Sequence, residues 1–111
     1  MTYNNKSMVF IETEMFSSLV NKYLSDNEYN ELQNFLMRHP DAGKIMRGGG
    51  GIRKMRWARN GVGKSGGIRA IYYWAKSKDE IYMLAIYAKS EKENIDNKTL
   101  TKIVKLLGDI K

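Results

Sequence analysis

The sequence predicts an α+β domain in which one curved, antiparallel β-sheet packs with an N-terminal helical hairpin and a C-terminal helix. Apolar residues recur at helical spacing in the first third of the chain and again near its end. The part between them is rich in the β-branched and aromatic residues that favour strands. The predicted strands follow one another through short loops, and strands joined in this way pair antiparallel. With 111 residues, 42% of them hydrophobic, the chain is expected to form a single domain over 1–111 around one core.

The first part of the chain carries the signals of a strand and two helices. The apolar run 8–11 suits a short buried strand. From Met15 onward apolar residues are spaced as in a helix, and the stretch 25–28, Ser-Asp-Asn-Glu, is a capping box that opens a second helix. This helix is expected to end before Pro40, because the residue that precedes a proline disfavours helix. The short connection between the two makes a helical hairpin.

Three strands and a helix are predicted in the rest of the chain. The strands cover residues 52–58, 68–74 and 81–87. The glycine-rich stretch 60–67 joins the first two, and a turn at 76–79 joins the last two. Asp96 caps the final helix, whose apolar residues form one stripe. The predicted order is therefore β-α-α-β-β-β-α.

The positive charge of the chain is concentrated in one span. The net charge is +7, and residues 44–78 contain ten Lys or Arg and no acid, against nine basic and twelve acidic residues elsewhere. A concentrated positive field favours a polyanionic partner, usually nucleic acid. The alternative is a solvated basic face without a partner. A membrane surface is disfavoured, because the span is predicted to form strands rather than an amphipathic helix.

Composition also argues against several classes of protein. There is no cysteine, which excludes disulfides and zinc–thiolate sites. The apolar stretch 81–88 is too short to span a bilayer, and the N-terminus lacks the apolar run of a signal peptide, so we expect a cytoplasmic protein with no membrane partner. His39 is the single histidine and stands in a predicted turn. Residues 61–66 match G-x-G-x-x-G but lead into a strand instead of opening a helix. No cofactor and no metal are therefore expected.

Cationic side chains alternate with apolar ones in the strand 52–58. Alternation places Lys54 and Arg56 on one face, and Met55 and Trp57 on the core face. If the next strand pairs as a hairpin, Arg69 lies across from the Lys54 and Arg56 row. Three cations on one sheet face repel one another, which implies an anionic ligand. A phosphodiester fits, because guanidinium groups hold its oxygens bidentately.

Three motifs carry a resemblance to a known family. They are 50–56, Gly-Gly-Ile-Arg-Lys-Met-Arg; 63–73, Gly-Lys-Ser-Gly-Gly-Ile-Arg-Ala-Ile-Tyr-Tyr; and 86–91, Ile-Tyr-Ala-Lys-Ser-Glu. In order and spacing they resemble the RelE/HigB toxins of type II toxin–antitoxin systems, within the RelE/ParE superfamily, over about residues 8–107. The resemblance implies the RelE-like microbial ribonuclease fold. It also implies a ribosome-dependent endoribonuclease, or mRNA interferase, in which the 2′-hydroxyl of the message attacks the adjacent phosphate and translation stops.

The resemblance also implies the residues of the site. The family's catalytic cations fall at Lys54, Arg56, Arg69 and Lys89, with Lys54 a candidate base. Further RNA-binding residues are predicted at Arg53, Arg59, Lys64, Tyr73 and Lys92. The RelE branch of the family carries an arginine where this chain has Ser90, so its role would pass to Lys89 or Lys92. The tyrosine of that branch near the last helix has no counterpart in the stretch 95–98.

The implied partners are the ribosome, mRNA and a cognate antitoxin, expected to be a helix-turn-helix protein. Two other functions stay open at this point. One is a non-enzymatic module that grips RNA phosphates without cutting. The other is repression of the chain's own promoter together with the antitoxin, for which the sequence offers no DNA-reading helix. Loss of cleavage, as opposed to loss of binding, on removal of single cations distinguishes the enzyme from the binding module.

Overall fold

The computed structural model describes residues 8–58, 67–92 and 94–110. The elements follow the chain as β1 (Val9–Glu12), α1 (Glu14–Tyr23), α2 (Asp26–Arg38), β2 (Lys44–Ile45), β3 (Arg53–Trp57), β4 (Ile68–Ala75), the 3-10 turn η2 (Lys76–Lys78), β5 (Glu80–Ala88) and α3 (Asn97–Ile110). This confirms the predicted order of helices and strands, with one added strand. The added strand, β2, has only two residues, too few for a periodic pattern to reveal it.

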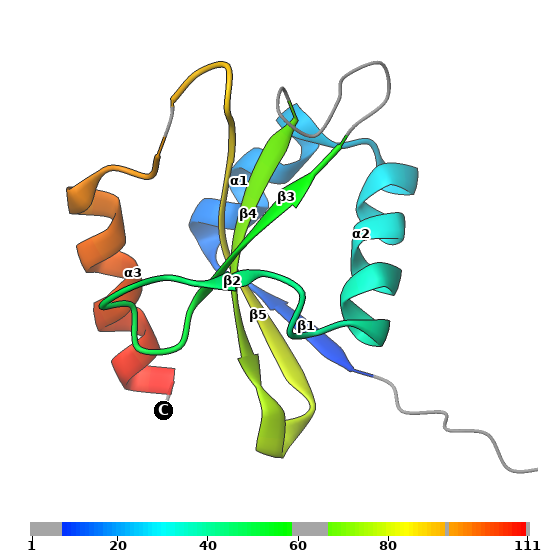
Figure 1. Cartoon of the computed structure of the whole chain (residues 1–111). Coiled ribbons are helices and arrows are strands. Elements are labelled where there is room, and N and C mark those ends of the chain that lie inside the picture. The colour runs from blue at the N-terminus through cyan, green and yellow to red at the C-terminus, as the bar shows by residue number, and fades with distance from the viewer. Residues whose placement is uncertain (1–7, 59–66, 93, 111) are drawn as a thin grey trace, which may run out of the picture.

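The five strands form one sheet in the order β1-β5-β4-β3-β2 (Figure 1). The pairs β2–β3, β3–β4 and β4–β5 are antiparallel, as predicted. The prediction of an entirely antiparallel sheet is wrong for β1, which lies parallel to β5 with Val9 opposite Glu80. Short loops set the direction of the other strands. The partner of β1 is some seventy residues away along the chain, so no local connection fixes its direction.

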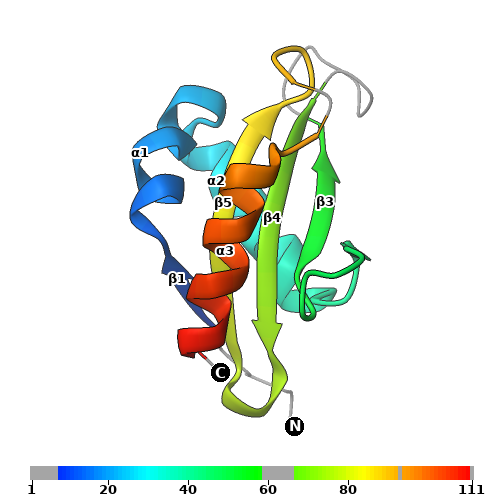
Figure 2. The same ribbon diagram turned by 90° about the vertical axis from the view of Figure 1, so that its left-hand side faces the viewer.

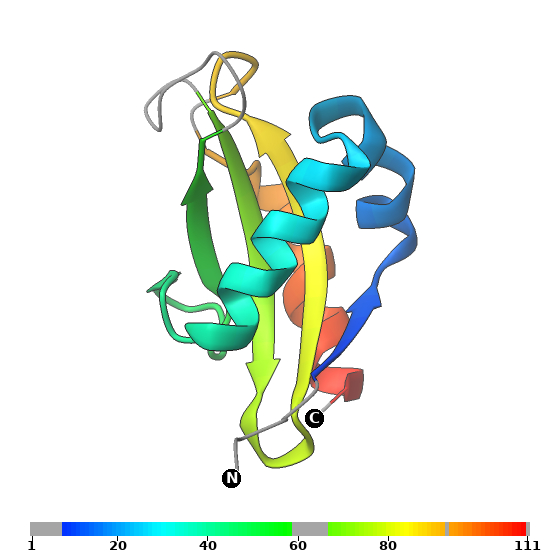
Figure 3. The same cartoon turned by 90° about the vertical axis from the view of Figure 1, so that its right-hand side faces the viewer.

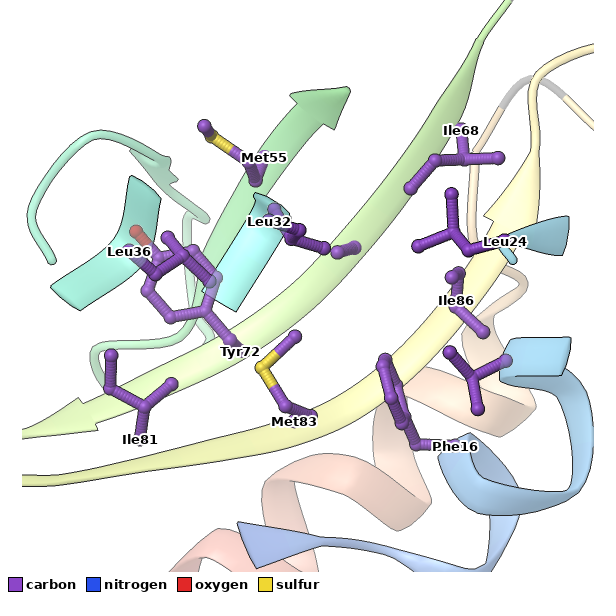
Figure 4. Close-up of a cluster of buried hydrophobic side chains, with 12 residues drawn as sticks. Phe16, Leu24, Leu32, Leu36, Met55, Ile68, Tyr72, Ile81, Met83 and Ile86 are labelled. Carbon is purple, nitrogen blue, oxygen red and sulfur yellow. The ribbon is translucent and has the colours of Figure 1, made fainter. Parts of the chain in front are cut away.

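Helices cover both faces of the sheet. α2 crosses one face diagonally (Figure 3), and α3 lies against the other (Figure 2). Instead of one continuous core, two apolar clusters form, one on each side. The α1/α2 cluster includes Phe16, Leu32, Leu36, Tyr72 and Met83, all fully buried (Figure 4). The α3 cluster includes Ile71, Leu84, Tyr87, Ile103 and Leu107.

Side-chain caps define where the helices begin. The predicted capping box is present: the Ser25 hydroxyl accepts from the Glu28 N–H at 3.1 Å, and the Glu28 carboxylate accepts from the Ser25 N–H at 2.8 Å. Asp96 accepts from the Thr99 N–H at 2.7 Å ahead of α3, and this bond lowers the pKa of the exposed Asp96 carboxyl. α2 ends at Arg38, before Pro40, as expected.

A β-bulge in β5 shifts which of its residues face each helix layer. Ile71 lies opposite Ala85, but Tyr72 lies opposite Met83, so Leu84 is an extra residue. Met83 packs into the α1/α2 cluster, whereas Leu84 and Ala85 both pack into the α3 cluster. Strict alternation from Met83 would have turned Tyr87 toward α1 and α2. The bulge instead places it on the α3 side.

Candidate active site

Arg56 of β3 and Arg69 of β4 lie directly opposite each other. The N–H of Met46 in the β2–β3 turn donates to the carbonyl of Ile52, so the backbone groups of the even-numbered β3 residues point toward β2. Arg56 and Arg69 therefore occupy a non-hydrogen-bonded pair, the position where facing side chains come closest. Lys54, two residues before Arg56, is on the same face. The predicted juxtaposition of Lys54, Arg56 and Arg69, called the cation cluster from here on, is confirmed.

The apolar residues between these cations explain their orientation. Met55 is buried in the α1/α2 cluster, and Trp57 packs against the same cluster. Because side chains alternate along a strand, burial of Met55 and Trp57 turns Lys54 and Arg56 toward the opposite face. Arg56 is exposed there. The hydrophobic pattern of β3 thus fixes which way its cations point.

Arg69 is the buried member of the cation cluster, with 4% of its surface exposed. One of its guanidinium bonds runs from Nη1 to the carbonyl of Ile68, at 3.3 Å. Burial of a charge is costly unless it is paired and hydrogen-bonded. A structural ion pair with an acid is the alternative to a bound ligand, and two acids, Glu91 and Glu93, follow β5 in the sequence. Glu91 is exposed and is contacted by Lys22, at 3.3 Å, and by the hydroxyl of Tyr23. Glu93 lies outside the described residues.

Tyr87 of β5 is the cross-strand partner of Arg69 on its other side. Its side chain is 3% exposed, and burial raises the pKa of its hydroxyl, while the charge of Arg69 acts in the opposite direction. The N–H of Ile95 also lowers this pKa, although the hydroxyl makes no hydrogen bond of ordinary geometry within the described residues. Sequence reasoning did not select Tyr87 as a site residue. Its place in the third family motif, two residues before Lys89, is the signal that marks it.

Lys54 contacts the segment before α3, and the backbone of Lys89 is bonded beside the start of β4. Lys54 is half-buried, and its Nζ lies 3.4 Å from Oδ1 of Asn94, a long hydrogen bond. Lys89 follows the end of β5, where its N–H donates to the carbonyl of Gly67 at 3.2 Å. This bond holds the Lys89 backbone beside the start of β4, two residues from Arg69.

The structure separates the predicted RNA-binding residues. Arg53 lies on the face opposite the cation cluster, where its Nη1 donates to the carbonyls of Asp41 and Gly43 at 3.0 and 2.9 Å. It holds the connection between α2 and β2. Tyr73 is half-buried against the α3 cluster, and exposed Lys92 lies over the Tyr87 ring, 5.8 Å from its centroid. Arg59 and Lys64 lie outside the described residues.

The described surroundings of the cation cluster supply positive donors and no metal site. Within the described ranges, no three His, Cys, Asp or Glu side chains gather where they could hold a metal ion. No helix in those ranges is both long and apolar enough to cross a membrane. The sequence carries no acid from residue 42 to residue 78. Two guanidinium groups and an ammonium on one face are suited to hold a phosphate and to stabilise extra negative charge on it.

Known proteins share this sequence pattern and architecture. The family model described as the RelE toxin of the RelE/RelB toxin–antitoxin system matches residues 10–110. Among solved structures, a double arginine mutant of the E. coli toxin RelE in the free state is similar with a TM-score of 0.59 and 16% identity, over 90% of this chain and 97% of that one. The isolated E. coli RelE toxin is similar with a TM-score of 0.54 and 16% identity, over 91% and 99%. The intact E. coli RelBE toxin–antitoxin complex contains a chain with a TM-score of 0.52 and 18% identity, over 72% and 94%.

Proposed function

The chain belongs to the RelE toxin family, and from this premise we propose that it is a ribosome-dependent endoribonuclease that cuts mRNA and arrests translation. The observation that carries the proposal is the Arg56–Arg69 pair, two guanidinium groups opposite each other on one sheet face, one of them buried. Like charges that face each other across strands destabilise a sheet. A phosphodiester between them compensates that repulsion.

The proposed reaction is transfer of the phosphate to the neighbouring 2′-oxygen. A bond forms between the 2′-oxygen and phosphorus, and the bond from phosphorus to the 5′-oxygen breaks, leaving a cyclic phosphate and a free 5′-hydroxyl. Arg56 and Arg69 stabilise the additional charge on the phosphate oxygens, which is usually the largest catalytic contribution. Lys54 is proposed to accept the proton of the 2′-hydroxyl, and water supplies the proton that the departing 5′-oxygen takes up. Lys89 is proposed to contact the same phosphate from the end of β5.

The proposed dependence on the ribosome is explained by the scarcity of histidine for acid–base catalysis. With a single histidine in the sequence, no pair of imidazoles is available for acid–base catalysis. Alignment of the 2′-hydroxyl with the leaving oxygen therefore has to supply much of the acceleration, and a message held in the decoding site is already positioned. We expect poor activity on free RNA for this reason.

A cleavage assay tests the proposal. Purified protein is incubated with one message, either naked or bound to ribosomes, and the new ends are mapped and their chemistry determined. Cuts within codons, only on the ribosome-bound message and with 5′-hydroxyl ends, are expected. Equal cleavage of naked and ribosome-bound message contradicts the ribosome dependence, and no cleavage of either contradicts the enzyme.

A cognate antitoxin is the proposed partner, because a nuclease that stops translation has to be held inactive. The family match, to the RelE toxin of the RelE/RelB toxin–antitoxin system, supports this proposal. Part of the contact is expected to be electrostatic, from acidic antitoxin residues near the basic span 44–78. Co-purification from the native host should recover a small, co-encoded protein, expected to carry a helix-turn-helix. Recovery of the chain alone contradicts the partner.

A further inference from the structure

A groove of about 590 Å³ runs along the outer edge of β3, beside the cation cluster. Its described lining consists of Phe35, Ala42, Lys44, Lys54, Met55 and Arg56. Arg56 and Lys54 thus belong both to the groove and to the cation cluster. None of these lining residues is acidic.

The groove exists because β2 covers only part of β3. β2 pairs with Arg53 and Lys54, and the preceding chain turns away through a bond from the Ala42 N–H to the carbonyl of His39. The backbone N–H and carbonyl of Arg56 point to this side, by the same alternation that directs those of Ile52 toward β2. Among the described residues no strand pairs with Arg56 there. The groove floor therefore offers a backbone donor and acceptor.

The two walls of the groove differ in chemistry. Lys44 and Lys54 are cross-strand partners, so their side chains share the face of Arg56 and form a cationic wall. The other wall is apolar, with Met55 and the half-buried ring of Phe35. The Phe35 ring lies 5.4 Å from that of Trp57 and 5.0 Å from that of His39, centroid to centroid, so its position is fixed by aromatic neighbours.

We propose that this groove binds one nucleotide of single-stranded RNA, adjacent to the phosphate held by the cation cluster. Its phosphate lies on the cationic wall at Lys44 and Arg56, and its base stacks on Phe35. Cations beside an aromatic ring on which a base can stack are the general means by which proteins hold single-stranded RNA without reading its sequence. Because Arg56 is shared, the two phosphates are neighbours on one strand. The inference rests on the proposed function in one respect: the identification of this RNA strand as the message.

Binding of an RNA that cannot be cut tests the groove without cleavage. The probe is a fluorescent 2′-O-methyl octanucleotide, and its affinity is measured by anisotropy over a series of salt concentrations. Lys44→Ala is expected to reduce the slope of log affinity against log salt by about 0.7, the loss of one single-strand phosphate contact. Phe35→Leu is expected to weaken binding about fivefold or more, with an unchanged slope.

Two variants serve as matched controls. Lys78→Ala removes an exposed cation at the distant β4–β5 turn, and Phe10→Leu removes an aromatic ring that packs against the same α1/α2 cluster from the opposite edge strand. Both should bind the octanucleotide like the wild type. Thermal melting of all four variants identifies any loss of affinity that comes from unfolding.

A second measurement locates the nucleotide on the ribosome. A message with 4-thiouridine next to the mapped cut, or next to the equivalent A-site position if no cut occurs, is irradiated with the bound protein. A crosslink to the peptide containing Phe35 supports the groove, also if the protein proves unable to cut. Crosslinks only elsewhere, together with Lys44→Ala and Phe35→Leu binding like the wild type, overturn it. The proposal is also overturned if an acidic peptide blocks the crosslink at Phe35 and the octanucleotide does not. The groove then accepts an added protein strand.

Discussion

Arg56 and Arg69 face each other across the β3–β4 pair at a non-hydrogen-bonded position, where facing side chains approach most closely. Only Arg69 is buried; Arg56 is exposed. Two facing cations cost the free protein stability. Under the proposed function the bound phosphate compensates this repulsion, and stability and activity are then expected to respond in opposite directions when the exposed member is removed.

Arg56→Ala is expected to leave the melting temperature unchanged or slightly raised and to reduce cleavage on the ribosome strongly. The substitution removes the repulsion on Arg69 together with one of the two guanidinium groups on the phosphate. Melting and the single-turnover cleavage rate check the two parts. Lys78→Ala, an exposed cation far from the cluster, is the control. A melting temperature that falls in step with activity would assign Arg56 a structural role instead.

Arg69→Ala is expected to reduce the cleavage rate by on the order of 10²–10³, the usual effect of losing one stabiliser of developing negative charge. If Arg69 is instead half of a buried structural ion pair, its loss costs roughly 3–5 kcal/mol of unfolding free energy. Urea denaturation alongside growth arrest separates the two. Arg69→Lys keeps the charge but not the bidentate geometry, so partial activity is expected. Full toxicity of Arg69→Ala contradicts its assignment to catalysis.

Two tyrosines on opposite faces of the sheet are expected to respond to loss of the hydroxyl with different signs. The Tyr72 hydroxyl donates to the carbonyl of Pro40 at 2.7 Å and accepts from the Gly43 N–H at 2.9 Å. Tyr72→Phe should therefore cost about 1–3 kcal/mol, because it leaves a buried N–H without its partner. Tyr87→Phe removes a buried hydroxyl without an ordinary hydrogen bond in the described structure and should be neutral or stabilising.

Urea denaturation of the two tyrosine variants measures the difference, and cleavage by Tyr87→Phe adds a second readout. If activity falls while stability does not, the hydroxyl acts on Arg69 or on the bound phosphate. Equal destabilisation by both substitutions contradicts the predicted difference between the two hydroxyls.

Thr13 ties the first helix to the bulge of β5. Its hydroxyl donates to the carbonyl of Leu84 at 2.9 Å and accepts from the Phe16 N–H at 3.0 Å, which caps α1. Thr13→Ala is expected to cost about 1–2 kcal/mol through loss of the cap. Thr13→Ser should restore most of it. Chemical denaturation provides the measurement, and a Thr13→Ser variant as unstable as Thr13→Ala contradicts the role of the hydroxyl.

Asp96 makes the stability of α3 depend on pH. Its folded pKa lies below the ordinary value of 3.8, chiefly because the Thr99 N–H donates to the carboxylate. A depressed folded pKa contributes stability that is present above about 3.8 and is lost as the pH falls through the folded value. Asp96→Asn retains a capping side chain that does not titrate. The advantage of the wild type over Asp96→Asn in melting temperature should therefore shrink on acidification below pH 3.8. A difference in melting temperature that is constant with pH contradicts the contribution of the ionised Asp96 carboxylate to stability.

Local sequence patterns determined much of the fold of this protein. The helical hairpin with its Ser25–Glu28 capping box, the helix that ends before Pro40 and the antiparallel strands joined by short loops could all be predicted, because each depends on neighbouring residues. The direction of Lys54 and Arg56 was predictable for the same reason: strand alternation couples it to burial of Met55 and Trp57. The resemblance of the motifs to the family then predicted these cations as a site, and this assignment stays a prediction.

Tertiary packing alone decided the rest. β1 lies parallel to β5 because the packing of α1 and α2 places it beside that strand. No local sequence pattern indicates a pairing partner so distant in the chain. The guanidinium of Arg53 donates hydrogen bonds to two loop carbonyls, and only the folded chain brings these groups together. Alternation along β5 predicts Met83 and Tyr87 on one face, yet the extra residue Leu84 turns Tyr87 toward Arg69. A bulge inserts one residue into a period of two and so exchanges the faces of the residues beyond it, and its place in β5 shows only in the pairing of β5 with β4.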